Sequence, residues 1–134
     1  MKRVLSIVLL LALLLTGCGS KGNVSGAVMD IGPSQMFGGG EIKAAMKVVV
    51  DVFDDEMEGC TLQELSYREE LNQKQGAEWA RQYHADEAIV IGSVFHVHEE
   101  DGPVTLEPGS THTWTWVLTR NEGEGWTLQT WGYA

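Results

Sequence analysis

The sequence predicts an α+β domain, with two helices packed on a curved antiparallel sheet and preceded by a signal peptide and a flexible tether. Three patterns predict this arrangement. Apolar residues recur every three or four positions after Glu41, as on the buried face of a helix. From Thr111 to Arg120, large side chains alternate with Thr and Val, as in a strand with one buried face. The apolar run 4–15 stands apart from both, near the N-terminus.

Residues 1–17 have the pattern of an export signal. Lys2 and Arg3 precede the apolar run, which is too short for a permanent membrane span of about 20 residues. Leu15-Thr16-Gly17-Cys18 then resembles the lipobox of bacterial lipoproteins. The resemblance implies cleavage before Cys18 and a diacylglyceryl group on its thiol, with the mature chain lipid-anchored to the extracytoplasmic face of the cell membrane. The alternative is an ordinary signal peptide followed by an incidental cysteine.

The charge of the mature chain restricts its partners. Removal of residues 1–17 leaves 7 basic and 19 acidic side chains, a formal net charge of −12 with histidine neutral. Nucleic acid is therefore an unfavourable partner, because phosphate contacts need clustered Lys and Arg. The same charge disfavours lying flat on anionic lipid. The partners that remain are the membrane, through the lipid on Cys18, and a protein or a small apolar ligand. No cofactor is indicated.

Residues 18–36 are expected to form a lipid-anchored flexible tether, because Gly and Ser are frequent and no apolar period is sustained. A flexible chain of this length reaches roughly 25 Å on average. The folded domain is then 37–134. Glycines 38–40 open the domain but lack the Gly-Lys-Ser/Thr ending of a phosphate loop.

The first half of the domain is predicted to be helical on either side of a short extended segment. A helix from Glu41 stops at Gly59, with an apolar face of Ile42, Ala45, Met46, Val49, Val50 and Phe53. A connector or strand follows over 61–67, with Leu62, Leu65 and Tyr67 inward. A second helix is expected over about 68–84; Gly76 weakens it, and its apolar contacts would be Leu71, Trp79, Ala80 and Tyr83.

The last third predicts three antiparallel strands, over 88–98, 111–120 and 126–133. Two helices laid over one face of this sheet would bury the apolar pattern. In a symmetric final hairpin Trp114 lies opposite Gly132 and Trp116 opposite Thr130, and Arg120 stacks on Trp126. One face of the middle strand carries His112, Trp114, Trp116, Leu118 and Arg120.

Segments 59–67, 88–95, 114–120 and 125–128, with Gly132-Tyr133, together resemble an uncharacterised lipoprotein domain of Gram-positive bacteria. The resemblance covers about residues 37–134 and leans toward a cell with a single membrane. That family has no assigned activity, so no functional residue is carried over. Helices followed by a curved sheet with a Trp-rich hairpin are also loosely similar to the nuclear transport factor 2-like (cone) superfamily. That superfamily includes isomerases and dehydratases alongside non-enzymatic binding domains.

Trp114, His96 and Tyr67 are the candidate ligand-binding residues. In a cone-like sheet Trp114 would lie near the open end, with His96 and Tyr67 beside it. An aromatic wall with few polar groups suits an apolar or sugar-like ligand. The competing interpretation is that Trp114 simply packs in the core.

Two further groups of residues could bind a metal ion or react as a thiol. His96, His98 and His112 could hold zinc or copper if the strand ends brought them to one point, and solvated histidines are the alternative. Cys60 has no partner cysteine once Cys18 is lipidated, and a buried structural thiol is expected there.

The sequence thus favours a cell-surface binding or accessory module with no catalytic motif. One alternative is an exported cone-fold enzyme of the isomerase or dehydratase type with His96 as its base. That enzyme requires His96 in a pocket, within hydrogen-bond reach of a carboxylate or tyrosine. The other alternative is a surface metal-binding protein that uses the three histidines.

Overall fold

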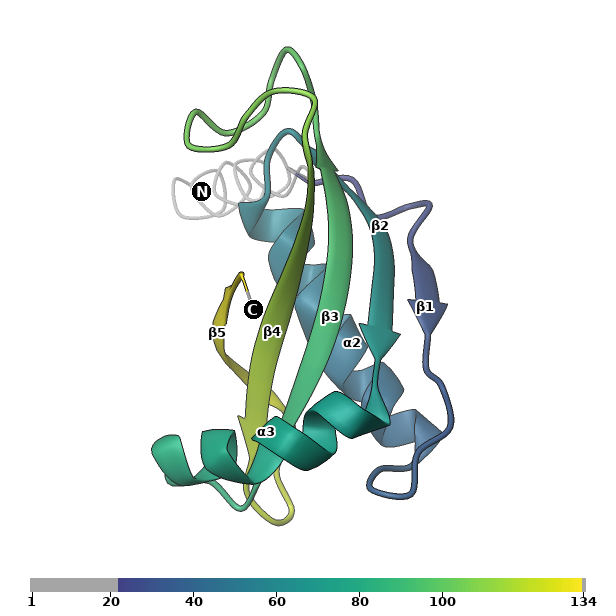
Figure 1. Ribbon diagram of the computed structural model, residues 1–134, viewed down its shortest axis with the longest axis vertical. Coiled ribbons are helices and arrows are strands. Elements are labelled where there is room, and N and C mark those ends of the chain that lie inside the picture. Colours follow the sequence, from purple (N-terminus) through teal and green to yellow (C-terminus); the bar gives the residue numbers. More distant parts are fainter. Residues whose placement is uncertain (1–21, 134) are drawn as a thin grey trace, which may run out of the picture.

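The computed structural model describes residues 22–133, so the export signal and Cys18 lie outside the described residues. Within this range the chain is an α+β fold with two helices packed against one five-stranded sheet (Figure 1). The strands follow one another across the sheet in chain order, and neighbours are antiparallel except β1 and β2, which are parallel. The predicted α+β class, with two helices packed on a sheet, is confirmed.

The elements, in chain order, are β1 (Val28–Asp30), α2 (Gly39–Glu56), β2 (Cys60–Tyr67), α3 (Glu69–Gln82), β3 (Glu87–Val97), β4 (Thr111–Arg120) and β5 (Thr127–Gly132). Between residues 22 and 133, neither helix is long and apolar enough to cross a membrane.

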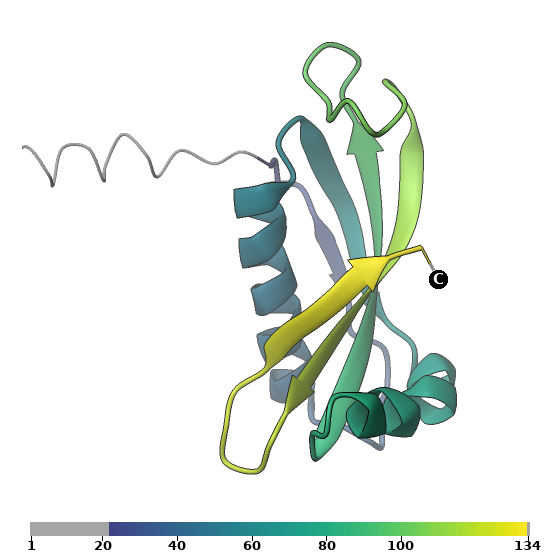
Figure 2. The ribbon, with the colours of Figure 1, turned by 90° about the vertical axis from the view of Figure 1, so that its left-hand side faces the viewer.

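The two helices lie on opposite sides of the sheet, which corrects the expectation that both cover one face. Figure 2 shows α2 along one side and α3 near one end of the other side. The reason lies in β3, whose two faces are both apolar. Ile89 and Ile91 belong to the core under α2, whereas Ala88 and Val90 are buried on the face that α3 contacts.

The main core lies between α2 and the sheet. The apolar face of α2 is buried as predicted, at Ile42, Ala45, Met46, Val49 and Phe53. The inward residues expected in the extended segment, Leu62, Leu65 and Tyr67, are buried too. Leu62 and Leu65 share a face although three residues apart, because a β-bulge lies between Leu62 and Glu64.

Helix α3 contacts the sheet through residues that the apolar pattern did not single out. Its buried residues are Asn72, Gly76 and Ala80, whereas Trp79 is only partly buried. A Cβ on Gly76 would lie 3.5 Å from the carbonyl oxygen of Ala88, so the helix approaches the backbone of β3 closely. Small side chains on this face therefore permit the contact. The buried face of the helix is distinguished by its small residues more than by apolar ones.

The expected tether 18–36 is corrected over its described part, residues 22–36. Asn23 forms a bridge with Thr61, and β1 adds a parallel strand to β2. Ser34 Oγ donates to Glu69 Oε1 at 2.7 Å, and the backbone nitrogen of Gln35 donates to Glu69 Oε2 at 2.7 Å. Glycine and serine in this segment form turns and caps against the domain. A backbone that makes such hydrogen bonds does not need a long apolar pattern to be ordered.

The register of the final hairpin also differs from the expectation. Trp116 pairs with Trp131 and Val117 with Thr130, while Thr115 takes Gly132 as its partner. A bulge between Val117 and Leu118 inserts one residue, so symmetric counting from the turn fails by one position. A shift of one residue exchanges the faces of a strand, which places Trp131 beside Trp116.

Candidate functional site

Aromatic side chains gather where β5 runs beside β4. We call His112, Trp114, Trp131 and Tyr133 the aromatic surface. Trp131 and Tyr133 are 44% and 66% exposed, and they are among the few large apolar side chains that face solvent. Single exposed apolar residues are ordinary, but adjacent ones indicate a binding surface.

The alternation of β4 builds this surface on the face of the sheet that carries α2. His112 pairs with Phe95 and Trp114 with Ser93, so both side chains point to the same face as Trp116. Within the described residues β5 pairs with β4 only from Thr115 to Thr119. The first residues of β4 extend beyond it, and their aromatic rings remain only partly covered.

Edge-to-face and stacked contacts hold the rings in place. Trp114 meets Phe95 and Tyr133 at centroid distances of 4.8 and 5.8 Å, and both pairs are T-shaped. Trp116 and Trp131 are stacked at 5.5 Å. Each such pair stabilises the fold by about 0.5–1.5 kcal/mol beyond the area it buries.

The polar groups of the aromatic surface are few, and one of them is unsatisfied. Tyr133 Oη and His112 Nδ1 lie 2.6 Å apart, and His112 Nε2 lies 2.7 Å from Ser110 Oγ. The buried Nε1 of Trp114 has no hydrogen-bond partner among the described residues. An unpaired donor of this kind costs about 1–3 kcal/mol.

Tyr133 also borders a hollow on the other side of the sheet. This hollow measures about 360 Å³ and lies between α3 and β4; its lining residues are Lys74, Gln75, Glu78, Trp79, Gln82, Thr115 and Tyr133. Tyr133 therefore connects the aromatic surface with a second partly apolar recess.

The three candidate ligand-binding residues do not come together. Trp114 lies in the aromatic surface, but Tyr67 pairs with Ile91 farther along the sheet and packs against Phe37 at 6.1 Å. His96 pairs with Thr111 and points to the face opposite Trp114. The three residues therefore line no shared pocket, because alternation places His96 on the opposite face from Trp114 and Tyr67 lies farther along the sheet.

Tyr67 has a structural environment. Its hydroxyl donates to Glu69 Oε1 at 2.6 Å and lies 3.2 Å from Ser34 Oγ. Burial, followed by the hydrogen bond to Glu69, raises the pKa of Tyr67 to about 12. We call Ser34, Tyr67 and Glu69 the latch, because they fasten the segment before α2 to the start of α3.

The three histidines do not form a common metal site. The hydrogen-bond partner of His96 among the described residues is Thr111 Oγ1, at 3.1 Å. His98 lies 2.7 Å from Thr61 Oγ1 and 2.9 Å from Asp101 Oδ1, and His112 lies on the opposite face from His96. In the part of the chain that the structure describes, no group of three His, Cys, Asp or Glu side chains could hold a metal ion.

The enzyme alternative required a carboxylate or tyrosine beside His96. The described hydrogen bonds of His96 include neither, so the arrangement that would activate it as a base is not formed among residues 22–133.

Cys60 is fully buried, as expected of a structural thiol. Burial, followed by the nearby charge of Asp101, raises the pKa of its thiol. A raised pKa lowers the thiolate fraction and makes the side chain unreactive.

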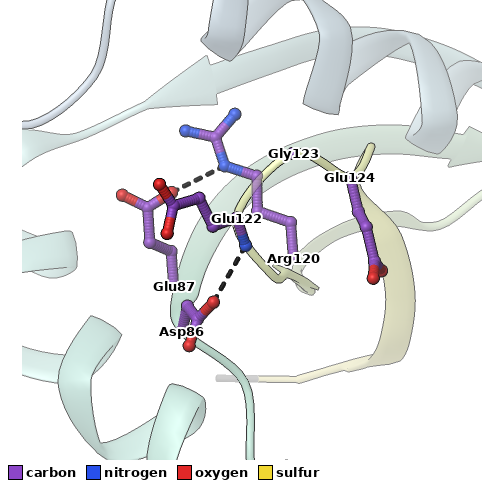
Figure 3. A pocket seen from close by; sticks show the side chains of 6 residues that line it. All are labelled: Asp86, Glu87, Arg120, Glu122, Gly123 and Glu124. Carbon is purple, nitrogen blue, oxygen red and sulfur yellow. Dashed lines mark hydrogen bonds and ion pairs between the residues drawn. The ribbon is translucent and has the colours of Figure 1, made fainter.

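A larger hollow of about 610 Å³ lies at the end of the sheet that bears the β4–β5 turn. Its lining residues are Asp86, Glu87, Arg120, Glu122, Gly123 and Glu124 (Figure 3). Arg120 points toward Glu87 and pairs with both Glu87 and Glu41, and its guanidinium lies 4.2 Å from the ring of Trp126, as the sequence predicted. The only cation of this hollow is therefore already neutralised, and its other side chains would repel an anion.

The aromatic surface was only partly visible in the sequence. Trp114 was identified, but Trp131 and Tyr133 were not, because their faces depend on the bulge in the final hairpin. The available signal was the cluster Trp131-Gly132-Tyr133 at the end of an alternating strand. Comparison with family models, with curated proteins and with solved structures finds no match to this chain.

Proposed function

We propose that this chain is a bacterial lipoprotein, anchored through Cys18 to the outer face of the cell membrane, whose folded domain is a binding module. The export signal and lipobox pattern of residues 1–18 support the anchoring. The observation that supports binding is the exposure of Trp131 and Tyr133 on a group of packed aromatic rings.

The ligand that best suits the aromatic surface is a sugar ring of a cell-surface glycan. Trp131 and Tyr133 offer flat apolar faces on which a sugar ring can stack. The exposed Tyr133 Oη can accept from a hydroxyl at the rim of that ring. Trp and Tyr supply contact area at small cost in side-chain entropy.

A titration with a defined glycan tests the binding site. The probe is the β-1,4-linked tetramer of N-acetylglucosamine, added to ¹⁵N-labelled chain lacking residues 1–18. We expect the indole N–H resonance of Trp114 to shift and to saturate. The indole of Trp126 donates to the carbonyl oxygen of Glu41 at 3.0 Å near the other end of β4, so its resonance is the internal control. A Trp114 resonance that moves no more than that of Trp126 at millimolar glycan would contradict the proposal.

The anchoring has its own test in the full chain expressed in a bacterial host. We expect the membrane fraction to contain a chain that begins at Cys18 and carries the mass of a diacylglyceryl group. Cys18→Ala should remain uncleaved and unmodified. A wild-type chain of unprocessed mass, or one that lacks the lipid, would refute the anchoring.

A further inference from the structure

The described chain begins fixed at one end of the domain. The backbone nitrogen of Gly22 donates to the carbonyl oxygen of Asp54 at 2.9 Å, and that of Asn23 donates to Cys60 at 2.9 Å. Gly22 is buried, and a Cβ there would lie only 2.5 Å from the carbonyl oxygen of Phe53. The chain from Gly22 onward is thus part of the folded body and cannot extend as a spacer.

Very little chain separates this fixed point from the lipidated cysteine. Only three residues, 19–21, lie between Cys18 and Gly22. Four steps of at most about 3.6 Å give a reach of about 14 Å. Strand β3 alone has 11 residues and is about 36 Å long at roughly 3.3 Å per residue. The connection is therefore much shorter than the long axis of the domain.

The end that holds Gly22 is formed by the segments 54–60 and 99–110, which we call the membrane-proximal end. The loop 99–110 is packed against Gly59: the backbone nitrogen of His98 donates to the carbonyl oxygen of Gly59 at 2.8 Å, and a Cβ on Gly59 would lie 1.9 Å from the carbonyl oxygen of Asp101. The loop stands at the top of the view in Figure 1. Val104 projects from it and is fully exposed.

The membrane-proximal end is acidic. Its two segments contain no Lys or Arg, and their carboxylates are Asp54, Asp55, Glu56, Glu58, Glu99, Glu100, Asp101 and Glu107. The screening length at physiological salt is about 8 Å, so carboxylates that come within about that distance of a bilayer sense its surface charge. Anionic headgroups repel this end, whereas zwitterionic headgroups do not.

We infer that the domain stands end-on and close to the bilayer, with the membrane-proximal end facing zwitterionic headgroups across at most about 14 Å. This inference rests on the proposed lipidation of Cys18. In this orientation the turn between β4 and β5 is the part farthest from the membrane, and the aromatic surface opens sideways.

The test measures the depth of two labelled positions in the full lipidated chain on phosphatidylcholine vesicles. Val104→Cys carries a fluorophore at the membrane-proximal end, and Glu124→Cys carries it in the exposed β4–β5 turn as the matched control. Cys60 is fully buried and should not take the label. We expect a nitroxide on the lipid headgroup to quench position 104 several-fold more than position 124. Equal quenching at the two positions would overturn the inference.

A longer connection supplies the second test. Insertion of twelve Gly/Ser residues between Lys21 and Gly22 should remove the difference between the two positions, because sixteen steps then reach at most about 58 Å, beyond the length of β3. A difference that survives the insertion would show that the short connection does not set the orientation.

Mass spectrometry and vesicle flotation of the same samples distinguish the proposed anchoring from the proposed orientation. A chain that lacks the lipid on Cys18 and does not float with the vesicles refutes both the anchoring and the orientation. A lipidated chain that floats but shows equal quenching refutes the orientation alone.

Discussion

Trp114 and Trp116 lie two residues apart on the same face of β4, yet their indole nitrogens differ in environment. Trp116 Nε1 donates to Ser93 Oγ at 2.8 Å inside the core. Trp114 Nε1 is buried without a partner among the described residues. An unpaired buried donor lowers the stability of a fold, so the two indoles should respond differently to substitution.

Replacing each ring by phenylalanine tests this difference. Trp114→Phe removes a donor that makes no bond, and we expect a free energy of unfolding that is unchanged or up to about 1 kcal/mol higher. Trp116→Phe removes a satisfied donor and leaves Ser93 buried, so it should lower stability by about 1–3 kcal/mol. Urea unfolding of both variants supplies the measurement. An equal loss in the two variants would mean that Trp114 Nε1 has a partner in solution.

Asn72 is a fully buried polar residue whose role only the structure reveals. Its Oδ1 accepts from the backbone nitrogen of Val90 at 2.8 Å, and its Nδ2 donates to the carbonyl oxygens of Val90 and Arg68 at 3.1 and 2.9 Å. The side-chain amide thus continues the pairing of β3 where β2 has ended.

Asn72→Ala should lower the free energy of unfolding by about 2–4 kcal/mol, because two backbone groups of Val90 lose their partner at once. The neighbouring Gln73 is exposed, and Gln73→Ala is the matched control with an expected change within about 0.5 kcal/mol. The comparison uses the midpoints of denaturant unfolding, provided that the dependence of the free energy of unfolding on denaturant concentration is unchanged. If the two variants were equally stable, Asn72 would not be the partner of β3.

At the scale of elements, the latch joins three parts of the chain. Glu69 at the start of α3 accepts hydrogen bonds from Tyr67, from the backbone of Gln35 and from Ser34, and these bonds lower the pKa of its carboxyl. Ser34 Oγ in turn accepts from the backbone nitrogen of Phe37, whose ring lies in the core. One carboxylate therefore helps to fix the segment that was expected to be a flexible tether.

The lowered pKa of Glu69 makes part of the stability depend on pH. A carboxyl with a folded-state pKa below its ordinary value of 4.5 stabilises the fold above that value, and its contribution disappears as pH falls through the folded-state pKa. Glu69→Gln should therefore have a lower Tm than wild type at pH 7, and the difference should narrow below about pH 4. The control is Glu70→Gln, which removes the same charge at the next position, outside the latch. A Glu69→Gln difference that stays constant from pH 7 to pH 3 would contradict this role.

The sequence predicts elements with a strong local period and misses those built by distant partners. Helix α2 and strands β3 and β4 were expected within about two residues of their bounds, since apolar spacing is a local property. Strand β1 was missed, because three residues between glycines and serines become a strand only when β2 lies beside them. The face of α3 was misassigned, because its contact with β3 uses Asn72 and Gly76 in place of large apolar side chains.

The sequence could predict single residues of the candidate site, but not which residues lie beside them. Alternation assigns Trp114 to one face of its own strand, but it does not fix which residues of the neighbouring strands lie beside it. The bulges in β2 and in β5 each shift the pairing by one residue. Trp131 and Tyr133 consequently joined Trp114, while His96 and Tyr67 lay elsewhere.

At the scale of the whole molecule, carboxylates outnumber cations at both ends of the sheet. The membrane-proximal end has no basic residue, and the hollow at the other end has Arg120 alone among acidic side chains. The ion pairs Lys47–Asp51, Arg68–Asp30 and Arg81–Glu78 are all exposed. Exposed pairs contribute little, so repulsion among like charges dominates the long-range electrostatics.

Salt should therefore stabilise this domain. Raising NaCl from 0.02 M to about 0.3 M shortens the screening length to below 10 Å and weakens repulsion between the carboxylates more than it weakens the few exposed pairs. We expect Tm to rise by several degrees for the chain 19–134. Glu99→Lys combined with Glu100→Lys reduces the charge of the membrane-proximal end without entering the core, and its Tm should respond less to salt. A Tm that falls with salt in wild type would show that attractive pairs outweigh the repulsion, and the same result would weaken the argument that anionic lipid repels this end.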